Sequence, residues 1–220
     1  MINAPAPPSK SGFCSDWIVW DRSTAPALMI TSLFVASVLA GIVLILFGVG
    51  DRGTVLALRV TARWSFALFW LAYTGAAMAK LFGPRLERLG RSGRELGLAF
   101  ASAQIVHLAL VLWLYRIATE PVGAMTFFWV GMGCLYGLAL FSVPRLRNVL
   151  DPHIWRISRT IAIEYITVVF AYDFVLGPLH AGIGQYPWSY IPFAVLLVGG
   201  VCLRAFAFAG SLWSRRLSAP

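Results

Sequence analysis

The chain has 220 residues, of which 59% are hydrophobic and 12% charged, whereas soluble domains average about 45–50% apolar and about 25% charged residues. Mean hydropathy is +0.77, and the net charge is +9, from 18 Lys and Arg against 9 Asp and Glu. These values exclude a disordered chain, a disulfide-stapled secreted module and an ordinary cytosolic enzyme. We expect an all-α polytopic membrane protein, because long apolar runs suit membrane helices and not the alternating strands of a transmembrane barrel.

Residues 1–25 are expected to form a cytoplasmic segment at the membrane surface. Trp17 and Trp20 stand beside charged residues such as Asp21, a mixture typical of membrane interfaces. The extreme N-terminus has no basic region, and the first apolar run is too long for the core of a cleavable signal peptide. A signal peptide is therefore not indicated.

Six stretches are long enough to cross a hydrocarbon layer of about 30 Å at about 1.5 Å per residue. In chain order they are Pro26–Val49, Leu58–Phe82, Glu95–Tyr115, Val122–Val143, Trp155–Leu179 and Trp188–Trp213. The loops between them are short, which predicts antiparallel neighbours. Residues 26–213 are therefore expected to form one bundle of six transmembrane helices, followed by a cytoplasmic tail over 214–220.

The positive charges predict the orientation of this bundle. Of the 18 Lys and Arg residues, 13 fall in the N-terminal segment, around the loops after the second and fourth stretches, and in the tail. Three fall on the other side, and two lie inside predicted helices. Because basic loops stay in the cytoplasm, both termini are expected to be cytoplasmic, in the inner (plasma) membrane. This topology explains the positive charge, so a nucleic-acid partner is not expected and the lipid bilayer is.

Four charged residues lie within the predicted helices, where each charge costs roughly 2.5–3.5 kcal/mol on insertion scales. The rise per residue places Glu164 and Arg204 at one depth and Arg63 and Asp173 at another. Two cross-helix ion pairs are therefore plausible. Glu164 and Asp173 are nine residues apart and face opposite sides of a helix, so they do not form one acid pair. Two structural pairs are favoured over a proton or ion path.

Two sequence motifs need separate interpretation. Residues 48–53 match the pattern GxGxxG, but a dinucleotide site needs a preceding strand, so we interpret them as a turn between two membrane helices.

His107 lies past the middle of the third stretch, near Ser102 and Gln104. A neutral imidazole there is satisfied by a cross-helix hydrogen bond, and it is also a usual axial ligand of haem.

The second and third stretches resemble a known family. They read Thr-Ala-Arg-Trp-Ser-Phe-Ala-Leu over 61–68, Gly-Pro-Arg-Leu over 83–86, and Gly-Arg-Glu-Leu-Gly-Leu-Ala-Phe over 93–100, with His107 ten residues after Gly97. This resembles the ferric reductase-like transmembrane domain, and most closely the haem-binding membrane subunit of the bacterial methionine sulfoxide reductase system. The resemblance covers roughly residues 58–180. It implies a six-helix haem protein, with His107 as the candidate ligand of haem b.

The chain departs from this family in the fifth stretch, where the resemblance implies two further haem-ligating histidines. The corresponding positions hold Ser158 or Arg159 and Ala171 or Tyr172. The only other histidines are His153 and His180, which are not expected at the depth of His107. An ordinary bis-histidine haem is therefore not expected, whereas a haem held through one histidine is compatible with the sequence.

Two functions stay open at this point. The first is a membrane redox subunit, an oxidoreductase component that passes electrons through a haem held by His107. No flavin or nicotinamide domain is expected in this chain, so electrons would come from a redox partner protein or a quinone. The second is a haem-free relative that acts as a membrane assembly, binding or transport subunit, in which Arg63, Glu164, Asp173 and Arg204 serve packing or a pathway.

Overall fold

The computed structural model describes residues 24–118, 126–143, 146, 149–177 and 188–217. Within these ranges every regular element is helical and no strand occurs, which confirms the all-α prediction. The predicted N-terminal segment (1–25) lies outside these residues except for its last two, which begin the first helix. The last helix continues through Leu217, into the segment that the sequence predicts as a cytoplasmic tail (214–220).

All six predicted stretches contain helices. The elements are α1 (Thr24–Phe47), α2 (Asp51–Phe82), the 3-10 turn η2 (Pro84–Leu86), α3 (Glu87–Arg91), α4 (Gly93–Ile117), α5 (Thr126–Phe141), α7 (Pro152–Ala171), the π-helical turn η3 (Tyr172–Leu176), the 3-10 turn η5 (Trp188–Tyr190) and α9 (Ile191–Leu217).

Four helical segments are long and apolar enough to cross a membrane: α1, α2, α4 and Trp188–Ser211. The α5 helix is apolar but has only 16 residues. The α7 helix carries Arg156, Arg159 and Glu164 within 20 residues, and these charges lower its hydropathy. Length and composition thus make the chain compatible with a membrane protein, with four candidate spans in the described residues.

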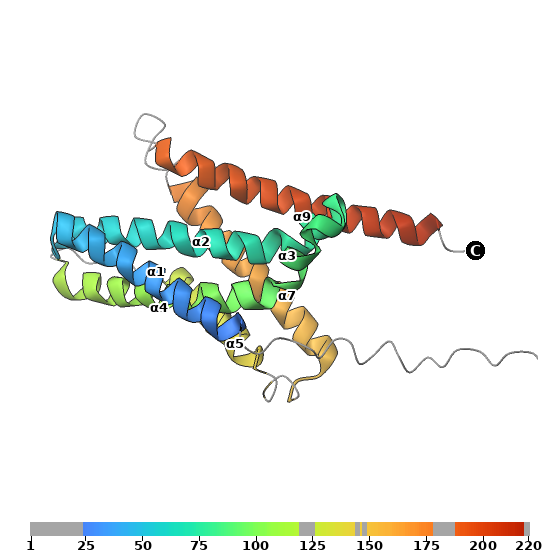
Figure 1. Ribbon diagram of the computed structural model, residues 1–220, viewed down its shortest axis with the longest axis horizontal. Coiled ribbons are helices and arrows are strands. Elements are labelled where there is room, and N and C mark those ends of the chain that lie inside the picture. Colours follow the sequence, from blue (N-terminus) through green and yellow to red (C-terminus); the bar gives the residue numbers. More distant parts are fainter. Residues whose placement is uncertain (1–23, 119–125, 144–145, 147–148, 178–187, 218–220) are drawn as a thin grey trace, which may run out of the picture.

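Helices α1, α2 and α4 lie side by side, α9 lies along another side of α2, and α7 crosses the group obliquely and packs against α5 (Figure 1). Their shared core is aromatic. The fully buried ring of Phe66 on α2 meets Phe170 of α7 and Phe174 of η3 edge-on, at centroid distances of 5.2 and 5.0 Å. Edge-to-face pairs contribute about 0.5–1.5 kcal/mol beyond their buried area, so this cluster joins the end of α7 to α2.

The turn between α1 and α2 contains the GxGxxG sequence. Gly48 has φ +82°, a conformation that glycine adopts without steric cost. A Cβ on Gly53 would lie 1.8 Å from the carbonyl oxygen of Gly48, so the close approach of helix and turn requires glycine there. The motif therefore joins two helices and follows no strand, as predicted.

The fifth predicted stretch begins with a capped helix and ends with a change of helical winding. The carboxylate of Asp151 accepts hydrogen bonds from the backbone N–H groups of His153 and Ile154, at 2.8 and 3.3 Å. Pro152 occupies the first turn, where its missing N–H costs nothing. After Ala171 the chain continues as η3, and such π-helical turns occur often at functional sites.

Candidate functional site

A cavity of about 840 Å³ lies between α2, α4, α5 and η3, and we call it the histidine cavity. Its walls are mainly aliphatic and aromatic, with Leu58, Val111 and Phe128 among them. The ionisable and phenolic side chains on the same walls are Arg59, Arg63, His107, Tyr172, Asp173 and Tyr190. An apolar enclosure with a few polar groups is the usual character of a small-molecule or cofactor site.

His107 is held in this cavity by a threonine from the neighbouring helix. The Oγ1 atom of Thr61 on α2 lies 3.0 Å from Nδ1 of His107 on α4. The same Oγ1 lies 2.9 Å from the carbonyl oxygen of Ala57 and 3.1 Å from that of Leu58. Thr61 is fully buried, so these contacts are not shared with solvent.

These three contacts favour one tautomer of the His107 ring. A hydroxyl has one proton to donate and two lone pairs to accept with. Since Thr61 donates its proton to the carbonyl of Ala57, one turn earlier in α2, it accepts a hydrogen bond from Nδ1–H of His107. The Nε2 atom then carries the lone pair. The backbone of Leu58 is a further hydrogen-bond partner of the His107 ring. In this tautomer the lone pair of Nε2 can serve a ligand role.

Arg59 and Arg63 lie on the same walls, and Arg63 contacts the start of the last helical segment. Arg63 donates from Nη2 to Oγ of Ser189 at 2.8 Å, and its guanidinium carbon lies 5.4 Å from the ring centroids of both Tyr190 and Phe193. The predicted pair between Arg63 and Asp173 is not formed, since no ion pair joins them in the described structure, although both side chains line the histidine cavity. Ser189, at the start of the last helical segment, is the hydrogen-bond partner of Arg63 in place of Asp173.

Asp173 lies in the π-helical turn and lines the same cavity as His107. Both side chains also line a smaller cavity of about 30 Å³, together with Gln104, whose buried Oε1 has no partner among the described residues. That volume is large enough to hold water. His107, Asp173 and Gln104 therefore line one small space beside the histidine cavity.

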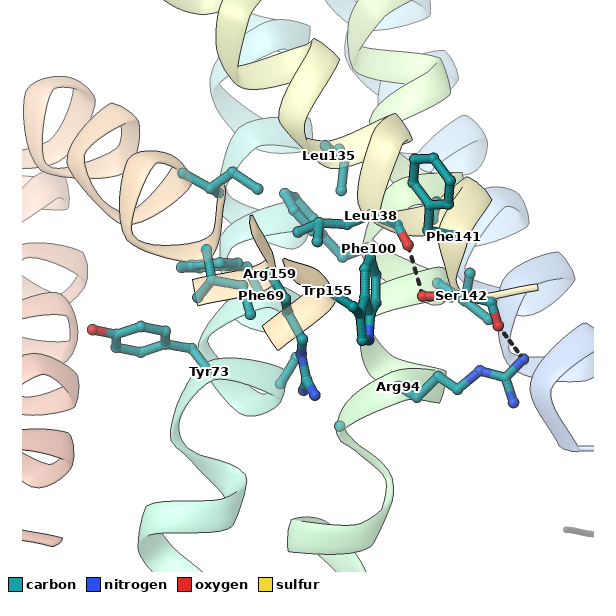
Figure 2. A pocket seen from close by; sticks show the side chains of 17 residues that line it. Phe69, Tyr73, Arg94, Phe100, Leu135, Leu138, Phe141, Ser142, Trp155 and Arg159 are labelled. Carbon is teal, nitrogen blue, oxygen red and sulfur yellow. Dashed lines mark hydrogen bonds between the residues drawn. The ribbon is translucent and has the colours of Figure 1, made fainter. Parts of the chain in front are cut away.

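The two fifth-stretch positions that the family resemblance singles out lie in different surroundings. Tyr172 lines the histidine cavity. Arg159 lines a separate chamber of about 200 Å³ between α2, α4, α5 and α7, where Figure 2 shows it beside Tyr73 and Trp155. The chamber is otherwise largely apolar, with Phe69 and Phe100 on its walls.

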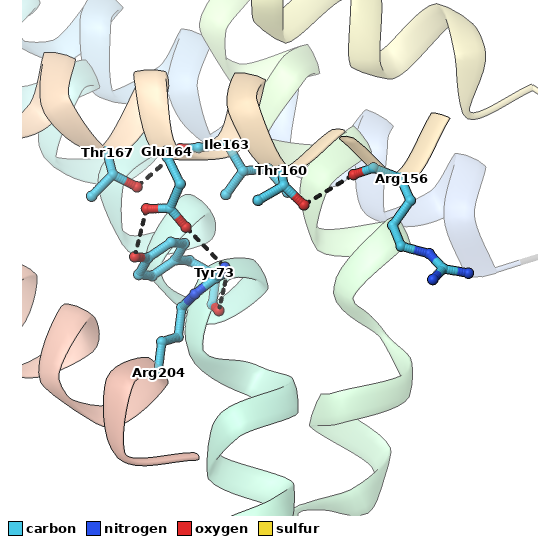
Figure 3. A network of polar contacts seen from close by, with 7 residues as sticks. All are labelled: Tyr73, Arg156, Thr160, Ile163, Glu164, Thr167 and Arg204. Atoms are coloured by element: carbon cyan, nitrogen blue, oxygen red, sulfur yellow. Dashed lines mark hydrogen bonds and ion pairs between the residues drawn. The ribbon is translucent and has the colours of Figure 1, made fainter. Parts of the chain in front are cut away.

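Glu164 and Arg204 form the predicted cross-helix pair. Nη2 of Arg204 on α9 lies 2.9 Å from Oε1 of Glu164 on α7. The hydroxyl of Tyr73 on α2 donates to the other carboxylate oxygen at 3.2 Å, and the guanidinium lies 4.1 Å from the centroid of the Tyr73 ring. Figure 3 shows this network joining three helices, so it packs them together. It lines neither the histidine cavity nor the smaller cavity beside it.

The residues of the histidine cavity fit a haem held through one histidine. His107 offers an oriented nitrogen ligand, the apolar walls suit a porphyrin, and Arg59 and Arg63 offer cations for its two carboxylates. Within the described ranges no second histidine lines the cavity, because His153 begins α7, while His180 lies outside those ranges. No group of three or more His, Cys, Asp or Glu side chains is placed to hold a bare metal ion in the described part.

Comparison with known proteins does not assign a function to this chain. No family model, no curated protein and no solved structure matches this chain. A function therefore has to be inferred from the histidine cavity and the residues around it.

Proposed function

We propose that this protein is an integral membrane electron-transfer subunit of ferric reductase-like type that binds one haem b through His107. The observation that carries the proposal is the ring of His107, oriented by Thr61 on the wall of a cavity of about 840 Å³. Cofactor sites have volumes of about 300–1,000 Å³. A haem ligand needs a deprotonated nitrogen facing such a space, and the hydrogen bond of Thr61 leaves Nε2 of His107 in that state.

The proposal includes a bundle in which α5 and α7 also cross the inner membrane, with both termini cytoplasmic. The charges of the described residues support this orientation. Basic side chains concentrate at the end where α2 stops and α4 and α7 begin, which we call the basic end; they are Lys80, Arg85, Arg88, Arg91, Arg94, Arg156 and Arg159. The opposite end, where α2 begins and α4 stops, holds Arg52, Arg59 and Arg116. Positively charged ends stay in the cytoplasm.

The side chains of the cavity have separate tasks in this proposal. A bound haem would supply a one-electron carrier within the membrane. His107 holds the iron, and Thr61 keeps the ring in its orientation and tautomer, as outer partners of metal-binding histidines do. Arg59 and Arg63 neutralise the two carboxylates, and the apolar walls exclude water. A redox partner protein or a quinone supplies the electrons.

The test is an absorption spectrum of the protein purified in mild detergent, oxidised and then reduced with dithionite, together with extraction and quantification of haem. We expect a Soret band that shifts on reduction and about one haem per chain. His107→Ala should abolish the band. Thr61→Val, which keeps the shape and removes the hydroxyl, should weaken haem binding by about 10–100-fold, the usual effect of losing an outer-shell partner.

His153→Ala is the matched control, because His153 lies at the exposed start of α7 and lines neither the histidine cavity nor the smaller cavity. This variant should keep the full band. An unchanged spectrum in His107→Ala would remove the ligand assignment. A spectrum lost equally in both histidine variants would point to damage of the fold and not to ligation.

A haem-free membrane binding, assembly or transport subunit is the second candidate. The observation that favours it is Asp173, a carboxylate on the cavity wall with no hydrogen bond or ion pair to the described residues. Ionisable side chains at membrane depth often mark a route for protons or cations. A folded, colourless protein without extractable haem would select this alternative.

A further inference from the structure

A second polar cavity, of about 840 Å³, opens at the basic end of the molecule, and we call it the arginine cavity. Four arginines line it: Arg94, Arg156, Arg159 and Arg204. No acidic residue of the described ranges lines it, although Glu164 lies next to it as the partner of Arg204. Four guanidinium groups thus line one concave space, with one carboxylate of the described residues beside it.

Arg94 and Arg156 keep N–H donors for a ligand. Arg94 uses one Nη2 donor on the carbonyl oxygen of Ser142, at 2.7 Å. A guanidinium has five N–H donors in a planar fork, so this contact fixes the side chain and leaves most of its donors unused. Arg156 points away from the Tyr73–Glu164–Arg204 network in Figure 3 and forms no side-chain hydrogen bond to the described residues. Forked donors of this kind bind phosphate in a bidentate manner.

The arginine cavity adjoins the apolar chamber of Figure 2. Arg94, Ser142, Trp155, Arg159 and Ile163 line both spaces, so the arginines stand where the polar cavity meets the apolar one. Figure 2 shows Arg94 and Arg159 on one side of a group of apolar side chains from α2, α4 and α5. A ligand that fits both spaces has an anionic head and an apolar chain.

The position along the helices suits a membrane lipid. Arg94 is the second residue of α4, and Arg156 and Arg159 are the fifth and eighth residues of α7. Helix ends lie at the depth of lipid headgroups, and basic pockets between transmembrane helices on the cytoplasmic side bind anionic headgroups.

We propose that the arginine cavity and the adjoining chamber bind one anionic phospholipid. Its phosphate lies among Arg94, Arg156 and Arg159, and part of one acyl chain enters the chamber. This inference rests on the proposed membrane topology but uses neither His107 nor haem, so its failure is distinguishable from that of the proposed redox function.

The test is a titration of delipidated protein in detergent, followed by native mass spectrometry that counts bound molecules. The probes are phosphatidylglycerol, phosphatidylcholine, glycerol 3-phosphate and inorganic phosphate. We expect one tight site for phosphatidylglycerol, at least about tenfold tighter than for the net-neutral phosphatidylcholine, since cations near anionic lipid each strengthen binding several-fold. Glycerol 3-phosphate and phosphate should bind far more weakly, because they have no acyl chain.

Three variants separate the parts of the site. Arg156→Gln together with Arg159→Gln should weaken phosphatidylglycerol binding about tenfold or more. Arg85→Gln together with Arg88→Gln removes the same charge from exposed residues of η2 and α3, outside both cavities, and should leave affinity unchanged. Arg156→Gln alone tests the site if the double variant fails to fold, and it should weaken binding several-fold.

The chamber is tested with Gly97→Leu. A Cβ at Gly97 meets no atom within 4 Å, so a larger side chain there enters the chamber without a clash at its base. It should weaken phosphatidylglycerol binding and leave binding of glycerol 3-phosphate unchanged. Equal affinity for the two phospholipids, or equal losses in the cavity and control variants, would overturn the site. Glycerol 3-phosphate binding as tight as that of the lipid would overturn the role of the chamber.

Discussion

The contact between Glu164 and Arg204 predicts a strongly non-additive pair of substitutions. The carboxylate has two contacts, 2.9 Å to Nη2 of Arg204 and 3.2 Å to the hydroxyl of Tyr73. Arg204 has two more, over the Tyr73 ring at 4.1 Å and from Nη1 to the Tyr73 carbonyl oxygen at 3.4 Å. Arg204→Gln therefore leaves a carboxylate with one neutral donor, whereas Glu164→Gln leaves a cation that still covers an aromatic ring.

The magnitudes follow from these contacts. Hydrogen bonds to charged groups contribute about 1.5–3 kcal/mol, and cross-helix polar contacts in membranes reach at most about 1.7 kcal/mol. The side chains of Arg204 and Glu164 are 33% and 46% exposed, so we take the lower part of these ranges. We expect losses in the free energy of unfolding of about 0.5–1 kcal/mol for Glu164→Gln and about 1–2 kcal/mol for Arg204→Gln. The double variant should lose less than Arg204→Gln alone, because no unpaired charge remains.

The assay is reversible unfolding of the detergent-solubilised protein by increasing SDS, followed by circular dichroism. The unsubstituted protein, the two single variants and the double variant are compared at one lipid-to-detergent ratio. Tyr73→Phe tests the third residue of the network and should lower the free energy of unfolding by about 0.5–1 kcal/mol. If the losses of the two single variants add up to the loss of the double variant within about 0.5 kcal/mol, the coupling is refuted, since independent sites behave in that way.

Two further predictions concern glycines in close contacts, each with a neighbouring control. Gly200→Ala should cost about 1–3 kcal/mol of unfolding free energy, because its Cβ would lie 2.9 Å from Nε1 of Trp70, whereas Gly199→Ala meets no atom within 4 Å and should be neutral or stabilising. Gly53→Ala should cost at least about 3 kcal/mol, through its clash with the turn after α1. Gly50→Ala, in open space, should cost less than about 1 kcal/mol. The same unfolding assay measures all four, and equal losses within either pair would contradict the packing described for it.

The helices and one ion pair follow directly from the sequence. Long apolar runs leave few alternatives to helix, so all six predicted stretches contain helices, with ends displaced by several residues at most termini. Glu164 and Arg204 are matched in depth by the constant rise per residue, and depth alone is enough to suggest a pair.

Rotation of the helices and local changes of winding could not be predicted in this way. Arg63 and Asp173 are also matched in depth, but Arg63 turns to Ser189, which follows a loop whose path the sequence does not specify. The π-helical turn at Tyr172–Leu176 has no sequence signal that we recognise. The hydrogen bond between His107 and Thr61 joins residues 46 positions apart, and only the side-by-side packing of α2 and α4 brings them together.

The length of α2 has a consequence for the membrane around it. Its 32 residues span about 48 Å, and a helix tilted by a typical angle of about 20° still spans about 45 Å, against a hydrocarbon thickness of about 30 Å. In the proposed membrane bundle this helix would extend through both headgroup layers. Arg59 would then lie close to the boundary between headgroups and hydrocarbon, while His107, on the wall of the same cavity, would lie at hydrocarbon depth.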